Sequence, residues 1–226
     1  MNVAIIPAGG KGTRFGGDVP KQFCEMSKKP LIIHTLQIFA AHKDINHIII
    51  GVHADYINYT RELLNIFGIE AEIAEGGHTR QQTVYNCLKK CISCNFVIIH
   101  DAARPFVSSE IISANIDCVK KYGAVNTVIP VTDAIIQSAN GNTAALLIPK
   151  DNLYHAQTPQ SFEHGIIMRA HENAKLKGIN NAPDDCGLCM DTTPVYLVRG
   201  SPNNIKITTS ENLDLFAPDR TERTIL

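Results

Sequence analysis

The sequence predicts an α/β fold of the Rossmann-like kind, in which a mostly parallel, twisted sheet is flanked by helices. Apolar runs of strand length alternate four times with segments whose apolar residues recur at helical spacing. The first apolar run ends in glycines, which is typical of a buried parallel strand before a turn. At 226 residues, the chain suffices for one large domain. We therefore expect a single domain over residues 1–226.

The first half of the chain supplies these alternating elements. Strands are expected at 2–8, 47–53 and 69–77 and within 95–106, and helices at 30–42, 56–68 and 79–92. Gly68 is a suitable stop for the second helix, and the last strand ends at His100, Asp101 and Arg104. Because crossovers between parallel strands are right-handed, functional loops should gather at the carboxyl ends of the strands.

The pattern changes after Val131. Two β-like runs surround Asn140-Gly141, a strong hairpin signal, and no helix is available for the segment 133–155 to lie on. We expect this segment to project as an apolar β-hairpin arm, for which a second copy of the chain is the simplest partner. The predicted homodimer depends on this arm. A helix at 161–178, strands at 194–200 and 204–209, and a last helix capped by Ser210 complete the chain.

Composition excludes several classes of function. The formal net charge is -1, so no basic field is present to hold nucleic acid or an anionic membrane. The N-terminus has no basic segment before a long apolar run, and no run approaches the ~20 residues that cross a bilayer. A cytoplasmic location is therefore expected.

The 7 cysteines are odd in number, which favours reduced thiols over a disulfide framework. The segments "CLKKCISC" and "CGLC" allow a zinc site, but small thiols in the core are the favoured interpretation.

The stretch "IIPAGGKGTRFGGDVPKQF" at 5–23 carries the first chemical signal. Glycines after a strand let backbone amides approach phosphate oxygens. The spacing of these glycines matches neither the dinucleotide fingerprint nor the Walker A pattern. Arg14 and Lys21 flank the loop, which suits a triphosphate during phosphoryl or nucleotidyl transfer. A tight turn with solvated charges is the alternative.

Five motifs in order resemble one family. "PAGGKGTRFGGDVPKQF" is similar to the loop of nucleotidyltransferases that activate sugar or polyol phosphates. Its Pro-Lys-Gln ending resembles the cytidylyltransferases that act on 2-C-methyl-D-erythritol 4-phosphate or ribitol 5-phosphate. "EGGHTRQQTV", "IHDAARPF", "QTPQSF" and "NNIKITTSENL" follow in the family's order, so the resemblance covers nearly the whole chain.

The resemblance implies a role for each matching residue. Catalysis would fall to Arg14, Lys21 and Lys206. CTP would meet Pro7, Ala8, Gly9, Gly10, Lys11, Gly12, Gly77, Arg80, Thr83, Asp101 and Ala102. The polyol phosphate would meet Asp101, Arg104, Asp133, Lys150 and Lys206. The resemblance also implies a Mg²⁺ ion with Asp101 as its ligand, and a divalent cation suits a triphosphate physically.

The implied reaction is an in-line attack by a phosphate oxygen of the acceptor on the α-phosphorus of CTP, and pyrophosphate leaves. The attacking oxygen is already an anion at neutral pH, so positioning and electrostatics suffice. His100 allows a general-base interpretation, but a histidine at the end of an apolar strand is more often packed or orienting.

Three positions depart from the family's pattern on the acceptor side. Ala134 and Pro183 stand where the methylerythritol-phosphate enzymes have threonines, and Lys150 where they have an arginine. These departures favour ribitol 5-phosphate over methylerythritol phosphate as acceptor, unless Thr132 or nearby backbone replaces a lost contact. In the family the arm reaches the neighbouring subunit, so Lys150 is a candidate for the partner's site. The rival functions are a sugar-1-phosphate nucleotidyltransferase using another nucleotide and an inactive nucleotide-binding homologue.

Overall fold

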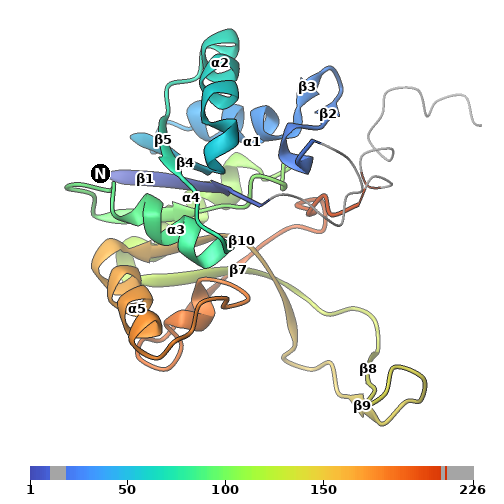
Figure 1. Ribbon diagram of the computed structural model, residues 1–226. Coiled ribbons are helices and arrows are strands. Elements are labelled where there is room, and N and C mark those ends of the chain that lie inside the picture. Colours follow the sequence, from blue (N-terminus) through green and yellow to red (C-terminus); the bar gives the residue numbers. More distant parts are fainter. Residues whose placement is uncertain (11–18, 210–211, 213–226) are drawn as a thin grey trace, which may run out of the picture.

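The computed structural model describes residues 1–10, 19–209 and 212, and its centre is a seven-stranded sheet (Figure 1). The strand order is β11-β7-β10-β6-β1-β4-β5, and β10 runs antiparallel to both its neighbours while the other pairs are parallel. The strands are β1 (Asn2–Ala8), β4 (His47–Val52), β5 (Glu72–Glu75), β6 (Phe96–Ile99), β7 (Ala124–Pro130), β10 (Tyr154–Glu163) and β11 (Tyr196–Arg199). The predicted mostly parallel sheet is confirmed.

Helices cover both faces of this sheet, as the alternation of strands and helices predicts. On β1, Ala4 and Ile6 belong to the apolar cluster that includes one group of helices, and Val3 and Ile5 to the cluster that includes the other. The first group is α1 (Leu31–Ala40), α2 (Ile57–Phe67) and α4 (Ser109–Tyr122), and the second is α3 (Arg80–Leu88) and α5 (His164–Leu176). No helix in the described parts of the chain is both long and apolar enough to span a membrane.

One helix boundary differs from the expected one because of β10. The helix expected at 161–178 begins at His164, since the residues before it pair antiparallel with β6 and β7. Apolar residues in this stretch fit a helix and a strand equally well, and only the two neighbouring strands decide between them. The helix α4 and the strand β7 are further elements that the four expected repeats did not include.

The arm projects away from the sheet, as predicted (Figure 1). It is built on β8 (Ile135–Gln137) and β9 (Leu146–Ile148), which pair antiparallel with each other. In the connection, Asn140 Oδ1 accepts hydrogen bonds from the backbone N–H groups of Asn142 and Thr143, both at 3.0 Å. Three large apolar side chains of the arm are more than half exposed: Ile136, Leu146 and Leu147.

The prediction of a strand at 204–209 is wrong. This segment joins no sheet and passes close to the loop after β6, where the Ile207 N–H donates to Ala103 O at 2.8 Å. The apolar alternation has another cause, because Ile205 and Ile207 pack into a small cluster with Met26 and Leu31. The helix expected from Ser210 lies outside the described residues.

Four cysteines lie in the apolar core, as the core-thiol interpretation predicts. Cys87, Cys91, Cys186 and Cys189 are buried in the cluster between the sheet, α3 and α5. Burial raises the pKa of the Cys87 thiol to about 12, so this sulfur stays protonated at neutral pH. Among the described residues no group of three or more histidine, cysteine or acidic side chains is arranged to hold a metal ion.

Candidate active site

Two cavities adjoin at the carboxyl end of β6. The larger, of about 640 Å³, is lined by Pro7, Ala8, Gly9, Gly10, Lys21, Gln22, Gly77, His78, Thr79, Arg80, Thr83, Asp101, Ala102, Ala103, Asn181, Lys206 and Thr208. The smaller, of about 240 Å³, is lined by Arg80, Asp101, Arg104, Ala156, Gln157, Thr158, Gln160, Pro183, Asp184 and Lys206. Arg80, Asp101 and Lys206 belong to both linings, and these three residues are called the shared wall below.

Bare backbone forms one side of the larger cavity. Gln22 Nε2 donates to Ala8 O at 2.7 Å and to Gly10 O at 2.9 Å, which fixes the chain where it leaves β1. A Cβ on Gly9 would lie only 2.7 Å from Thr83 Oγ1, so glycine permits this close approach. The larger cavity therefore presents a fixed stretch of main chain to whatever occupies it.

A second glycine loop, before α3, also lines the larger cavity and packs against the first at Gly76 and Gly9. The Gly77 N–H donates to Thr83 Oγ1 at 3.0 Å, and the Thr83 hydroxyl donates to Thr79 O at 2.9 Å. Thr79 Oγ1 in turn accepts from the Gln82 N–H and caps α3. A Cβ on Gly77 would lie 2.2 Å from the Gln82 side chain, so this turn too depends on glycine.

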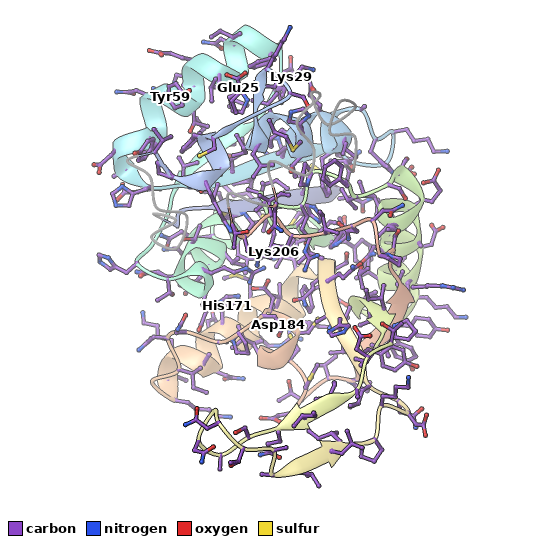
Figure 2. The ribbon with its side chains drawn as sticks, turned by 90° about the vertical axis from the view of Figure 1, so that its right-hand side faces the viewer. Glu25, Lys29, Tyr59, His171, Asp184 and Lys206 are labelled. Atoms are coloured by element: carbon purple, nitrogen blue, oxygen red, sulfur yellow. The ribbon has the colours of Figure 1, made fainter. Side chains whose placement is uncertain are left out.

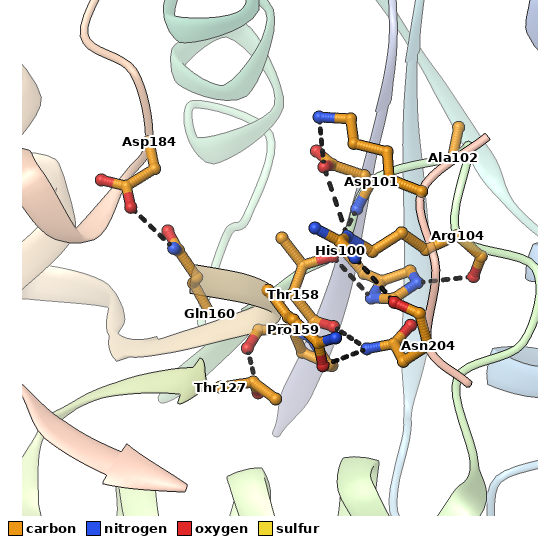
Figure 3. Close-up of polar contacts among 12 residues, drawn as sticks. His100, Asp101, Ala102, Arg104, Thr127, Thr158, Pro159, Gln160, Asp184 and Asn204 are labelled. Atoms are coloured by element: carbon orange, nitrogen blue, oxygen red, sulfur yellow. Dashed lines mark hydrogen bonds and ion pairs between the residues drawn. The ribbon is translucent and has the colours of Figure 1, made fainter. Parts of the chain in front are cut away.

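The shared wall concentrates positive charge around one carboxylate (Figure 3). Asp101 Oδ2 lies 2.7 Å from Lys206 Nζ and 3.8 Å from Arg104 Nε, and Asp101 Oδ1 lies 3.0 Å from Arg80 Nε. Burial by itself raises the pKa of Asp101, but Arg80, Lys206 and Arg104 outweigh it and hold the pKa well below its usual range. Asp101 is therefore charged, and an excess of positive charge remains for anionic ligands.

His100 lies behind this wall with both ring nitrogens bonded (Figure 3). Thr158 Oγ1 accepts from the Asp101 N–H at 3.1 Å, so its hydroxyl donates to His100 Nδ1 at 3.0 Å. Nε2 is then the protonated nitrogen and donates to Arg104 O at 3.0 Å. Burial lowers the pKa of His100 to about 4, so the ring is neutral. These bonds support an orienting histidine over a general base.

The segment 204–208 carries Lys206 and is bonded by two further cationic side chains. Lys206 lies in the middle of the molecule, well apart from the arm (Figure 2). Lys21 Nζ donates to Ile207 O at 3.1 Å, and Arg104 Nη1 donates to Asn204 O at 2.7 Å. Asn204 Nδ2 donates to Thr158 O at 2.7 Å, which ties the segment to β10. The segment is thus held from three parts of the chain.

Comparisons with known proteins agree on one family. The family model for 2-C-methyl-D-erythritol 4-phosphate cytidylyltransferase matches residues 2–217. The chain belongs to this family. It is 39% identical over 220 residues to the 2-C-methyl-D-erythritol 4-phosphate cytidylyltransferase of Clostridium botulinum (strain Langeland), covering 95% of each chain. It is 37% identical to the enzyme of that name from Alkaliphilus oremlandii, covering 92% of this chain and 90% of the relative.

Solved structures of the same family share the fold. The 4-diphosphocytidyl-2C-methyl-D-erythritol synthase of Anaerococcus prevotii superposes with a TM-score of 0.81 at 27% identity, over 95% of each chain. The Thermus thermophilus cytidylyltransferase superposes with a TM-score of 0.76 at 29% identity, over 94% of this chain and 95% of that one. The predicted family resemblance is confirmed, and the chain is a nucleotidyltransferase of the CTP-dependent cytidylyltransferase type.

Most of the predicted site residues line these two cavities. The larger cavity is lined by Pro7, Ala8, Gly9, Gly10, Lys21, Gly77, Arg80, Thr83, Asp101, Ala102 and Lys206, and Arg104 lines the smaller one. Asp133 and Lys150 line neither cavity, because both lie on the arm. Lys150 Nζ instead donates to Thr132 O at 2.7 Å across the base of the arm. The predictions for Lys11, Gly12 and Arg14 fall outside the described residues.

Several lining residues carried no predicted role. Gln22 belongs to the Pro-Lys-Gln ending of the first motif, and Gln157, Thr158 and Gln160 belong to "QTPQSF". Both motifs indicated a functional site, but only the three-dimensional structure shows which of their side chains line a cavity. Asn181 lines the larger cavity without any such motif, and its position depends on how its segment packs against α3.

The described residues do not fit a protein-built magnesium site. Asp101 is the acidic side chain of the shared wall, and both its oxygens are engaged by cationic groups. No cluster of three ligand-type side chains occurs in the ranges 1–10 and 19–209. Mg²⁺ is often held by one or two carboxylates together with substrate phosphates, so Asp101 as its ligand stays a prediction that requires the triphosphate to complete the site.

Proposed function

We propose that this cytidylyltransferase converts CTP and 2-C-methyl-D-erythritol 4-phosphate to 4-diphosphocytidyl-2C-methyl-D-erythritol and pyrophosphate. The observation that carries the proposal is a pair of adjoining cavities of unequal size with a cationic wall in common. One cavity has room for a nucleotide, the other for a small phosphorylated polyol, and the two phosphates would meet at the wall. The relatives named above carry methylerythritol phosphate in their names, so the sequence-based preference for ribitol 5-phosphate is not supported.

The larger cavity is the proposed CTP site. Ala8, Gly9, Gly10 and Gly77 all line it, and their backbone groups would offer hydrogen bonds to the edge of the cytosine base. Lys21 and Lys206 lie on its lining, where they would bind the triphosphate and steady the departing pyrophosphate. The lysine charges are held in place before any ligand binds, since Lys21 bonds Ile207 O and Lys206 bonds Asp101.

The smaller cavity is the proposed acceptor site. Arg104 and Lys206 supply positive charge, and Gln157 and Thr158 supply polar groups for hydroxyls. Pro183, one of the three departures from the family's pattern, lines this cavity, whereas Ala134 and Lys150 lie on the arm. The acceptor phosphate would lie beside the shared wall, from which its oxygen attacks the α-phosphorus of CTP.

The reaction then needs charge and geometry but no general base. The attacking phosphate oxygen is an anion at neutral pH, and His100 is neutral with both nitrogens engaged. Arg80, Arg104 and Lys206 would neutralise the charge that gathers as the new P–O bond forms and the bond to pyrophosphate breaks. We propose that Mg²⁺ arrives bound to the triphosphate, where it supplies further charge neutralisation.

We also propose that the active form is a homodimer joined through the arms. The exposed apolar side chains Ile136, Leu146 and Leu147 would be buried by a second copy. Lys150 lines neither cavity of its own chain, which supports a role in the partner's site. Sedimentation of the wild type and of Leu147→Glu tests this: a dimer that dissociates in the variant supports the arm, and an unchanged dimer contradicts it. The cytoplasmic location stays a prediction from sequence.

A pyrophosphate-release assay tests the proposed reaction. CTP is combined in turn with 2-C-methyl-D-erythritol 4-phosphate, ribitol 5-phosphate, arabinitol 5-phosphate and glycerol 3-phosphate, and UTP and ATP then replace CTP. We expect the highest kcat/KM with CTP and methylerythritol phosphate. A higher kcat/KM with ribitol 5-phosphate would reverse the choice of acceptor. Turnover with UTP or ATP equal to that with CTP would contradict the assignment of the larger cavity to cytidine.

A further inference from the structure

Asp185 is a buried carboxylate to which no role has been given so far. Its side chain is 1% exposed, and it comes from the segment 179–186, remote in sequence from both glycine loops. We propose that Asp185 is a positioning residue. It holds the Arg80 guanidinium in the shared wall and so keeps the two cavities aligned with each other. This inference rests on the proposed function, because it assigns the wall to the meeting point of nucleotide and acceptor.

The Arg80 guanidinium lies between two carboxylates. Arg80 Nη1 lies 2.8 Å from Asp185 Oδ2, and Arg80 Nε lies 3.0 Å from Asp101 Oδ1. Burial alone lowers the pKa of Arg80, but Asp185 and then Asp101 outweigh it and raise the pKa. Two ion pairs to different parts of the planar guanidinium fix both its position and its orientation, which one pair does not do.

Asp185 is itself held firmly. Gln160 Oε1 accepts hydrogen bonds from the backbone N–H groups of Asp185 at 3.0 Å and Cys186 at 3.1 Å. Gln160 belongs to β10, and its Nε2 donates to Asp184 Oδ2 at 3.1 Å (Figure 3). Gln160 on the central sheet therefore fixes the backbone at Asp185, and the Asp185 carboxylate in turn fixes the Arg80 guanidinium through their ion pair.

The residues on either side of Arg80 bind the same segment. Thr79 Oγ1 donates to Asn180 O at 2.8 Å, and Gln81 Nε2 donates to Ile179 O at 2.7 Å. Gln81 Oε1 accepts from the Ala182 N–H at 2.9 Å. Three consecutive residues at the start of α3 thus dock on the segment 179–185, with the Arg80–Asp185 ion pair in the middle.

This docking joins the linings of the two cavities. The segment gives Asn181 to the larger cavity and Pro183 to the smaller one, while Arg80 lines both. His171 lies on the other side of Asp185, with Nε2 at 3.9 Å from Oδ1. Burial lowers the pKa of His171 to about 4, so this ring is neutral. Burial raises the pKa of Asp185, and Arg80 is the group that opposes this rise by stabilising the carboxylate. Loss of Asp185 would leave Arg80 anchored to Asp101 alone.

A double-mutant cycle tests the proposal. Asp185→Asn, Arg80→Gln and the double variant are compared with the wild type in steady-state assays with CTP and 2-C-methyl-D-erythritol 4-phosphate. Asp185→Asn should lower kcat by roughly 10- to 100-fold, since a small displacement of an aligned group suffices for that, and change KM for CTP less than about threefold. If Asp185 acts through Arg80, adding Asp185→Asn to Arg80→Gln should change kcat by less than about twofold. Asp191→Asn, an exposed carboxylate on the following segment, is the matched control and should behave as wild type.

Each result of the double-mutant cycle either supports or overturns the role of Asp185. Additive losses in the double variant, or a wild-type kcat for Asp185→Asn, would overturn the proposal. If Asp185→Asn fails to fold, folding of the double variant supports the pairing, and failure of both overturns it. If the wild type shows no turnover with these substrates, the proposed function fails separately. Thermal melts of the same four proteins still test the ion pair, because the two substitutions should then have non-additive effects on Tm.

Discussion

The two cavities are built in different ways. The larger one includes bare backbone at Gly9, Gly10 and Gly77, from two glycine loops that each directly follow a parallel strand of the sheet. The smaller one is lined by side chains from β10, from the loop after β6 and from the segments around 183 and 206. Main chain that must approach a ligand is recognisable in the sequence as glycine, whereas no local pattern shows which distant side chains meet in one pocket. The predictions below test this difference, from the largest expected effect to the smallest.

Lys21→Ala should have the largest effect. Loss of one preorganised charge at a developing anion lowers kcat by at least ~100-fold, and KM for the acceptor should change little. Lys29→Ala is the matched control, because Lys29 Nζ donates to Gln37 Oε1 at 3.2 Å and lies on neither cavity lining. Steady-state kinetics of both variants are the measurement. A kcat near wild type for Lys21→Ala would remove Lys21 from catalysis.

Gly9→Ala tests whether the larger cavity depends on bare backbone. The new Cβ would lie 2.7 Å from Thr83 Oγ1, and Thr83 cannot easily shift because it bonds Gly77 and Thr79. Overpacking of this kind costs about 1–3 kcal/mol, which lowers Tm by roughly 2–4 °C for each kcal/mol in a chain of this size. A Cβ on Gly10 meets nothing within 4 Å, so Gly10→Ala should leave Tm unchanged in the same melts. Equal melting of the two variants would contradict the close approach.

Lys150→Ala tests the side-chain pocket and the arm together. If Lys150 reaches the partner's acceptor site, its loss should raise KM for the polyol phosphate about tenfold, the scale of one charged contact, and leave KM for CTP nearly unchanged. The two KM values are measured by varying each substrate in turn. An effect confined to CTP would show that the arm serves the nucleotide side instead.

The smallest expected effect is a pH dependence of stability. His100 lies behind Asp101 and His171 beside Asp185, and each has a pKa of about 4 in the folded chain against an ordinary 6.5. Below pH 6.5 the unfolded chain therefore binds protons that the folded chain does not, so stability falls as pH falls from about 6.5 towards 4. Between pH 7 and 5.5 each ring should cost about 1 kcal/mol.

His171→Phe separates the two rings. Phenylalanine keeps a ring next to Tyr85, which lies 5.7 Å from His171 between centroids, and removes one titrating group. Denaturant unfolding at pH 7 and 5.5 should show a loss of stability that is about 1 kcal/mol smaller in the variant than in the wild type. An unchanged loss would mean that His171 titrates normally in the folded chain.

Prediction from sequence succeeded where a pattern is local. The parallel strands, the hairpin around Asn140-Gly141 and the glycine loops all follow from short-range spacing and from backbone conformations that few residues adopt. It failed at 204–209, where alternating Ile205 and Ile207 pack on a side cluster and form no strand, and at β10, where pairing partners decide between strand and helix. It also gave no role to Asp185, because one acidic residue among many has no local pattern.

By itself, the sequence determined the family and the two glycine loops, and it singled out the lysines and arginines proposed for catalysis, because each depends on residue type within a short window. Only the tertiary structure decided which charges meet. Asp101, Arg80 and Asp185 come from three separate segments. Their ion pairs exist because the fold brings the loop after β6, the start of α3 and the segment 179–186 together, so that Arg80 lies within 3.0 Å of both carboxylates. Ion pairing depends on distance in space, and distance in space between remote segments is set by the packing of the whole sheet.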